Sequence, residues 1–183
     1  MPHIHTKPGQ HDMTVSAYIV RKKVGEWQCL VHLHRKLGVL MQVGGHIELD
    51  ETPWQAMAHE LEEESGYTLA ELAILQPDLA QPRVTGAVTH PLPFMMNTHT
   101  AGPAHYHSDT CYAFVAEQPP RAKPKDGESQ DVRWLSINDM KALKQANGVA
   151  ILDDVVDMYA AIIENLFTYK SMPAALFSLD KPL

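Results

Sequence analysis

One helix is marked at both ends in the amino-acid sequence. Thr52 and Gln55 stand at the spacing of a capping box, and Pro53 occupies the first helical position between them. Gly66 follows at a place where helices commonly end in the left-handed conformation. These signals predict a helix over residues 53–65.

The segment in front of this helix is expected to form a strand and then a turn. Residues 40–43 are mostly apolar, and Gly44 and Gly45 end that run. Because glycine lets the backbone approach a metal or phosphate closely, a carbonyl group in this turn is a candidate cation ligand. The predicted order is therefore strand, glycine turn, loop and helix.

Three carboxylates share one side of the predicted helix. At about 100° per residue, Glu60, Glu63 and Glu64 fall within roughly one 100° arc, whereas Glu62 points to the other side. Like charges at helical spacing repel one another, so this arrangement is stabilising only with a cation between them. Clustered hard oxygen ligands suit Mg²⁺. The alternative interpretation is a solvated acidic helix face.

A longer pattern contains these glutamates and resembles the Nudix box. Eight of the nine defined positions of that box agree with this chain, and His59 stands where the family has arginine. The agreeing residues are Gly45, Glu51, Glu60, Leu61, Glu63, Glu64, Gly66 and Tyr67.

The resemblance implies an α/β fold, the Nudix-type α/β/α sandwich with a mixed central sheet. It also implies a hydrolase that cleaves a diphosphate linkage, often in a nucleoside diphosphate derivative, with Mg²⁺ or Mn²⁺. The family's metal ligands fall on Gly45, Glu60, Glu63 and Glu64, and one of these glutamates or a later acid would deprotonate the attacking water. The clustered carboxyls are expected to have raised pKa values without metal.

Three further residues receive roles from the same resemblance. Glu51 and His59 are expected to support the site, because His59 lies one turn before Glu63 and can hold it as the family arginine does; otherwise His59 does little. A weakened brace predicts reduced or pH-sensitive activity. Glu128 precedes a predicted strand that contains tryptophan, and some family members carry a further acid there; the alternative is a solvated loop charge.

Substrate contacts outside the box are less marked. Arg35 and Lys36 are candidates for binding substrate phosphates, or else they are solvated loop charges, and His46 is assigned to substrate binding. Pro82 lies sixteen residues beyond Gly66, a placement that resembles ADP-ribose-type Nudix hydrolases. A nucleotide sugar, an ADP-ribose-like compound and a nucleoside triphosphate stay open as substrates. A catalytically weak module that binds a nucleotide-like ligand is the alternative function.

Histidines gather in the second half of the chain. His105 and His107 are two residues apart on a predicted strand and therefore share a face. Together with Asp109 and with the more distant His90 and His99, they raise the question of a zinc site. Structural zinc sites usually contain cysteines or closer pairs, so lining of the substrate pocket is the favoured interpretation.

Composition bounds the class of protein. The chain has 183 residues and a formal net charge of −7, which argues against a general nucleic-acid-binding surface. It contains no apolar run near eighteen residues, and its first five residues do not form the apolar core of a signal peptide. Cys29 and Cys111 are expected to be free buried thiols. We therefore expect a cytoplasmic protein without membrane or nucleic-acid partners.

The remaining pattern predicts one domain over residues 1–183, with an irregular extension at 1–12 and a helix and tail at 149–183. A wide apolar stripe on the helix 149–168 indicates core packing or the contact of a homodimer. Residues 69–76 are ambiguous between helix and strand. The other expected strands are 13–21, 27–34, 93–100, 105–117 and 131–135, and a further helix spans 136–145, closed by Asn147 and Gly148.

Overall fold

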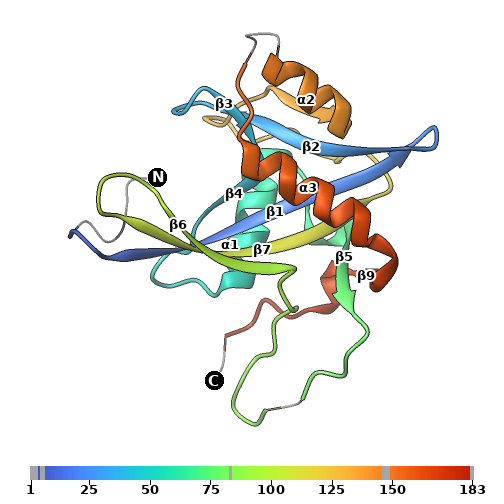
Figure 1. The fold of residues 1–183 in the computed structure, drawn as a ribbon. Helices are drawn as coiled ribbons and strands as arrows, with labels where there is room; N and C mark the ends of the chain where they lie inside the picture. Colours follow the sequence, from blue (N-terminus) through green and yellow to red (C-terminus); the bar gives the residue numbers. More distant parts are fainter. Residues whose placement is uncertain (1–3, 5–6, 83, 146–148, 182–183) are drawn as a thin grey trace.

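The computed structural model describes residue 4 and residues 7–82, 84–145 and 149–181. In this part of the chain a nine-stranded mixed sheet carries helices on both faces (Figure 1). The strand order is β3-β2-β1-β7-β5-β9; β4 also pairs with β1, β6 with β7 and β8 with β2. β1 and β7 are parallel, and the other pairs are antiparallel. The strands are β1 (His11–Lys23), β2 (Glu26–His34), β3 (Val39–Met41), β4 (Val43–His46), β5 (Leu72–Pro77), β6 (Met95–Thr100), β7 (Tyr106–Ala116), β8 (Val132–Leu135) and β9 (Tyr169–Pro173).

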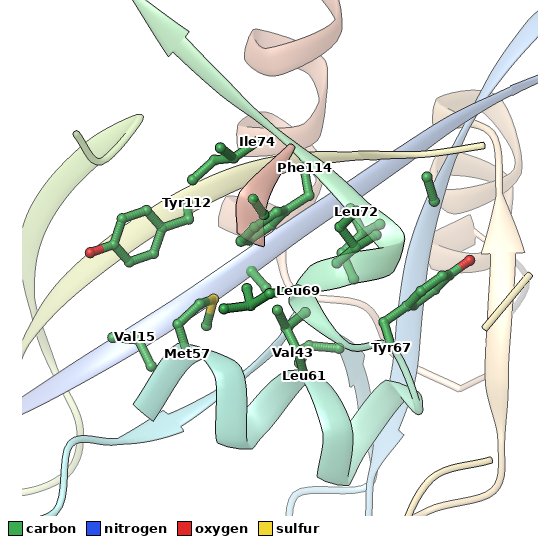
Figure 2. Packing of buried hydrophobic residues seen from close by; sticks show 14 of the residues in the cluster. Val15, Val43, Met57, Leu61, Tyr67, Leu69, Leu72, Ile74, Tyr112 and Phe114 are labelled. Carbon is green, nitrogen blue, oxygen red and sulfur yellow. The ribbon is translucent and has the colours of Figure 1, made fainter. Parts of the chain in front are cut away.

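Alternation along β1 sends side chains into two separate hydrophobic layers. Val15 and Ile19 pack in the cluster that contains Trp54 of α1 (Pro53–Glu60). Tyr18 lies on the other face with Tyr159 of α3 (Asp153–Asn165), and α2 (Ile137–Gln145) joins that layer. Figure 2 shows the first layer, with side chains of the helix pointing toward the sheet. The predicted α/β/α sandwich with a mixed sheet is thus confirmed.

The predicted helix forms, although its second half has a different geometry. Both hydrogen bonds of the capping box join Thr52 and Gln55, and Gly66 ends the helix with φ of 75°. Between them α1 continues directly into one π-helical segment, Leu61–Ser65. A π turn is uncommon and is frequently found at functional sites.

Several expectations need correction. Gly44 and Gly45 do not form a turn; they lie inside β4, where a side chain on Gly44 would overlap the carbonyl oxygen of Val15 on β1. The first strand begins at His11, within the segment expected to be irregular, because its backbone pairs with β7. The ambiguous segment forms a short 3₁₀ turn and then β5.

The C-terminal region also differs from its expected form. α3 begins at Asp153 and not at Val149, and its apolar stripe packs on the sheet, which confirms core packing. The strand β9 was not predicted. It pairs with β5 by a register that runs from Ala73↔Pro173 to Pro77↔Tyr169. The expected helix closure at residues 147 and 148 lies outside the described residues.

Two expectations from composition can be compared with the structure. Cys29 and Cys111 are both free and buried, as predicted. In the described ranges no helix is long and apolar enough to cross a membrane.

Replacement of Gly66 by alanine tests the helix end. Gly66→Ala should cost about 1–2 kcal/mol for left-handed backbone and a further ~1–3 kcal/mol for overlap with the carbonyl oxygen of Ala122. Gly86 is the matched control, because its φ of 76° is nearly the same and no atom would meet its added Cβ within 4 Å. Urea unfolding of both variants measures the difference, and equal losses would contradict the close contact at Gly66.

Candidate active site

Four glutamates at the end of α1 and in the π-helical segment that follows it are divided between two sides, as the sequence predicted. Glu60 and Glu64 are buried, with 5% and 7% of their surfaces exposed, and Glu63 is half-buried. Glu62 is exposed on the other side. Three of the four carboxyls therefore lie on the side of the helix that faces the protein and the loop beside it.

The carboxyl of Glu60 lies directly against the backbone of β4. A Cβ on Gly45 would overlap the Glu60 carboxylate, so the carboxyl would have to move to admit any larger residue at this position. Burial, supplemented by the charges of Glu63 and Glu128, raises the pKa of Glu60 to about 7 even though His59 acts in the opposite direction. The helix and the glycine strand therefore hold this carboxyl in a closed space.

Glu64 lies beside Glu60 in the same region. Its Oε2 accepts a hydrogen bond of 2.9 Å from the backbone N–H of Gly44 and lies 3.2 Å from Nε2 of His32. Burial is the largest influence on its pKa, and the charge of Glu60 adds to it, so the pKa rises to about 9 despite the Gly44 hydrogen bond. Burial also lowers the pKa of His32 to about 4, which makes His32 a neutral neighbour at pH 7.

Glu63 has different surroundings. Its Oε1 lies 2.9 Å from Nε2 of His59 and 3.2 Å from Nζ of Lys125. Burial alone would raise its pKa, but the hydrogen bonds from these two residues outweigh burial and lower it. The expectation of raised pKa values is thus correct for Glu60 and Glu64 and wrong for Glu63, because two cationic partners stabilise its ionised form.

His59 bridges two glutamates. Its Nδ1 lies 3.2 Å from Oε1 of Glu51, while its Nε2 contacts Glu63. Burial lowers the pKa of His59, yet the hydrogen bond to Glu63 and the nearby carboxylates more than compensate and raise it. His59 therefore lies between Glu51 and Glu63 and contacts both, and its supporting role stays a prediction.

The loop before β8 approaches the glutamates from the other side. The backbone N–H of Lys125 donates a hydrogen bond to the carbonyl oxygen of Glu63, and that of Glu128 donates to the carbonyl oxygen of Lys125. The charge of Glu128 raises the pKa values of both Glu60 and Glu64. Nη1 of Arg35 donates a hydrogen bond to the carbonyl oxygen of Gly127 in the same loop. Lys36 is exposed next to Arg35. The structure thus brings Glu128 to the site and places Arg35 against the loop that carries it.

His46 does not join this group. It follows Gly45 on β4, so its side chain points to the opposite face of the sheet. There its Nε2 lies 3.4 Å from Oδ2 of Asp12, and its ring lies against His107. The side chain of His46 therefore lies on the face of the sheet opposite the glutamates, and its assignment to substrate binding stays a prediction.

The histidine group of the sequence is also divided. His105 and His107 lie close to Asp12, whereas Asp109 accepts hydrogen bonds from Thr14 and Cys111. His99 is exposed; its Nδ1 bonds to Asn97, and its ring lies 5.4 Å from that of His107. His90 is half-buried in the loop ahead of β6.

Three residues near these groups were not recognised in the sequence. His32 shares a strand face with Leu30, because alternate residues point the same way, and this periodicity was the signal that it faces α1. Asp12 shares a face with the paired Thr14 by the same rule. Lys125 lies in a proline- and lysine-rich loop, and nothing in its local pattern singles it out.

A family profile described as NUDIX domain matches residues 10–155. Among solved structures, a hydrolase of the NUDIX family from Clostridium perfringens is similar at 27% identity, with a TM-score of 0.63, covering 85% of this chain and 97% of that one. A search of curated proteins finds no match.

Two more distant structures share the fold. The NUDIX domain of Shewanella oneidensis NrtR, in complex with ADP ribose, is 15% identical with a TM-score of 0.61, covering 86% of this chain and 89% of that one. A Caenorhabditis elegans Ap4A hydrolase is 17% identical with a TM-score of 0.59, covering 84% and 98%. With the profile spanning most of the sequence and the box glutamates gathered at one site, the chain belongs to the Nudix family and is a Nudix hydrolase, an enzyme that acts on phosphoanhydride bonds.

Proposed function

We propose that this hydrolase cleaves the diphosphate linkage of a nucleoside diphosphate derivative and that it requires Mg²⁺ or Mn²⁺. The observation that carries the proposal is the burial of two carboxyls, Glu60 and Glu64, side by side against the glycines of β4. Two buried acids of like charge are costly to ionise together. A divalent cation would offset that cost, and an all-oxygen donor set suits a hard cation.

The residues that would hold the cation are Glu60, Glu63, Glu64 and the backbone of Gly45. When bound, a divalent cation neutralises charge on the diphosphate oxygens and lowers the pKa of bound water. The chain's own contribution is to position carboxylates around the scissile bond and to take a proton from the attacking water.

Glu63 is the proposed general base. Its lowered pKa keeps it ionised at neutral pH, and His59 and Lys125 hold its side chain from two directions. Water attacks phosphorus, the bond from that phosphorus to the bridging oxygen breaks, and the proton of the water passes to the carboxylate. Glu128, on the facing loop, is the alternative base. Arg35 beside that loop would contact a substrate phosphate.

The class of substrate is proposed from the neighbours and from one sequence feature. ADP ribose is bound to one neighbour, and another is an Ap4A hydrolase. Pro82 adds the weak resemblance to ADP-ribose-type enzymes. We propose an ADP-ribose-like compound first, with nucleotide sugars and nucleoside triphosphates in the same screening panel. Release of a nucleoside monophosphate identifies cleavage of the diphosphate.

The alternative is a catalytically weak module that binds a nucleotide-like ligand. Its motivation is the replacement of the family arginine by His59. Against it, His59 makes contacts to both Glu51 and Glu63, as a supporting residue would. Binding of a panel compound without turnover would favour this alternative.

Two further parts of the proposal concern the whole chain. We propose that residues 1–183 form one Nudix domain, since strands from β1 to β9 share one sheet. We also propose a cytoplasmic location, which the free state of both buried cysteines supports.

Removal of single carboxylates tests the assignment. Glu63→Gln and Glu64→Gln should each lower kcat by at least about 100-fold, because each removes a carboxylate that is a proposed metal ligand and, at Glu63, the proposed base. Glu62→Gln is the matched control on the exposed side of the same helix. Monophosphate release with Mg²⁺ is the measurement, and comparable losses in all three variants would contradict the division of roles.

Thermal melts at several pH values test the buried pair. The folded pKa values of about 7 for Glu60 and about 9 for Glu64 lie above the usual 4.5. In metal-free protein, the contribution of these two groups to the free energy of unfolding should therefore be largest below about pH 4.5. This contribution should be lost as the pH rises through 7 and 9. The increase of Tm caused by Mg²⁺ should grow over the same range. In Glu60→Gln/Glu64→Gln both trends should vanish; a Mg²⁺ effect independent of pH would argue against this site.

His59→Arg tests the brace on Glu63. Native turnover should fall at alkaline pH once the imidazolium of His59 loses its proton, whereas arginine keeps its charge and should preserve turnover. His59→Gln is the control, since it keeps a hydrogen-bond donor without charge. The pH profiles of kcat for the three proteins make the comparison, and identical alkaline limbs would remove the role of the imidazolium.

A further inference from the structure

A fully buried carboxylate lies at the start of β1, on the opposite side of the sheet from α1. Asp12 has no exposed surface. Its Oδ2 lies 3.3 Å from Nε2 of His105 and 3.4 Å from Nε2 of His46. The backbone N–H of Ile4 donates a hydrogen bond of 3.0 Å to the same oxygen. An ionised carboxylate at such depth needs positive charge close to it.

A third imidazole completes the group. Asp12, His105 and His107 each offer a ligand atom within 4.8 Å of the others. The ring of His107 lies 4.9 Å from that of His46 and 5.6 Å from that of His105, edge to face in both cases. Three imidazoles thus lie around one carboxylate; His105 directly precedes β7, His107 lies near the start of β7, and His46 comes from β4.

The distances match the geometry of a tetrahedral metal site. Zinc bonds of about 2.0–2.2 Å to nitrogen and oxygen place neighbouring tetrahedral ligand atoms about 3.3–3.6 Å apart. The two separations from Asp12 to His105 and His46 are 3.3 and 3.4 Å. Charge-assisted N–H···O hydrogen bonds are shorter, about 2.7–2.9 Å. These two separations are wider than those of a tight ion pair and fit ligands around a cation; the ligand atoms of Asp12, His105 and His107 all lie within 4.8 Å of one another.

The backbone fixes these side chains before any ligand arrives. In the parallel register of β1 and β7, Asp12 is the partner of His107, and in the β1–β4 register Thr14 is the partner of His46. The turn that carries His105 is tied to the start of β1, because Tyr106 N–H donates to the carbonyl oxygen of Gln10. Figure 1 shows the β6–β7 hairpin beside the beginning of β1 at this end of the sheet.

We propose that Asp12, His105 and His107 form a second metal site, separate from the glutamate site, with His46 beside it. Two imidazole nitrogens and one carboxylate oxygen suit Zn²⁺ and similar transition metals, whereas Mg²⁺ prefers oxygen ligands alone. The bound ion joins β1 to the β6–β7 hairpin and stabilises the fold. His3 and His5 lie outside the described residues.

The direct test is zinc binding by the metal-stripped full chain. Calorimetry in excess Mg²⁺ should show one tight Zn²⁺ per chain, and Co²⁺ at the same site should give the intense visible absorption of tetrahedral coordination. Zn²⁺ should also raise Tm in a concentration-dependent manner. Absence of tight Zn²⁺ uptake would overturn the proposal.

Variants identify the ligands. His105→Ala/His107→Ala should weaken Zn²⁺ binding by at least about 100-fold, the upper end of what loss of a mere supporting residue costs. His11→Ala is the matched control. His11 is exposed and adjacent to Asp12 in the sequence, and its own Nδ1 bonds to Ser108. Asp12→Asn, which keeps the side-chain shape, repeats the test if the double variant does not fold by circular dichroism. Undiminished Zn²⁺ binding in a folded ligand variant would refute this ligand set.

One more variant separates this site from the proposed catalytic site. Glu60→Gln/Glu64→Gln should retain the tight Zn²⁺ while losing the Mg²⁺ effect on Tm. Loss of Zn²⁺ binding in that protein would mean that zinc occupies the glutamates, and the second site would be rejected even though the proposed hydrolase stood.

Discussion

The contact between the end of α1 and the glycines of β4 organises the rest of the molecule. Gly44 allows β4 to lie close to β1, and Gly45 leaves room for the carboxyl of Glu60. The N–H of Gly44 then binds Glu64. β4 is held by its pairing with β1, and α1 is held by hydrophobic contacts with the sheet. The protein can therefore keep two acids in a buried position that they would not adopt alone.

Two residues hold the carboxylate of Glu63, one with a titratable side chain and one with a permanent charge. An arginine at position 59 would offer a permanent charge and a two-pronged contact. His59 instead uses its two ring nitrogens to reach two different glutamates, Glu51 and Glu63, and Lys125 supplies the permanent charge from the facing loop. The positive charge beside Glu63 is thus divided between a titratable residue in the helix and a lysine that comes from outside the box.

Much of this arrangement could be predicted from the sequence, because it depends on local rules. The helix from Pro53, its end at Gly66 and the sidedness of Glu62 follow from capping and periodicity. The strand β9 could not be predicted in this way, since a short half-exposed segment forms a strand only when β5 offers it an edge. The π-helical segment Leu61–Ser65 could not be predicted from the sequence either, because its glutamates lie on the same sides in an α-helix and in a π-helix.

The same limit explains the errors at individual site residues. His46 was assigned to substrate binding, but adjacent residues of a strand face opposite ways, and its side chain lies on the face away from the glutamates. Lys125 reaches the glutamates only through the tertiary fold, so no spacing along the chain reveals it. Strand periodicity indicates the face on which His32 lies, but it does not show that Glu64 is its neighbour. Asp12 was missed because its partners lie more than thirty positions away in sequence.

The shortness of β4 has a mechanical consequence. Gly45 and His46 are joined by a single peptide bond, which is rigid, so a tilt of that unit moves both residues at once. β4 is paired with β1, and the carboxyl of Glu60 lies against one face of the strand while the rings of His46 and His107 lie at the other. A shift on the imidazole side would therefore reach, within one residue, the backbone beside Glu60, a proposed metal ligand.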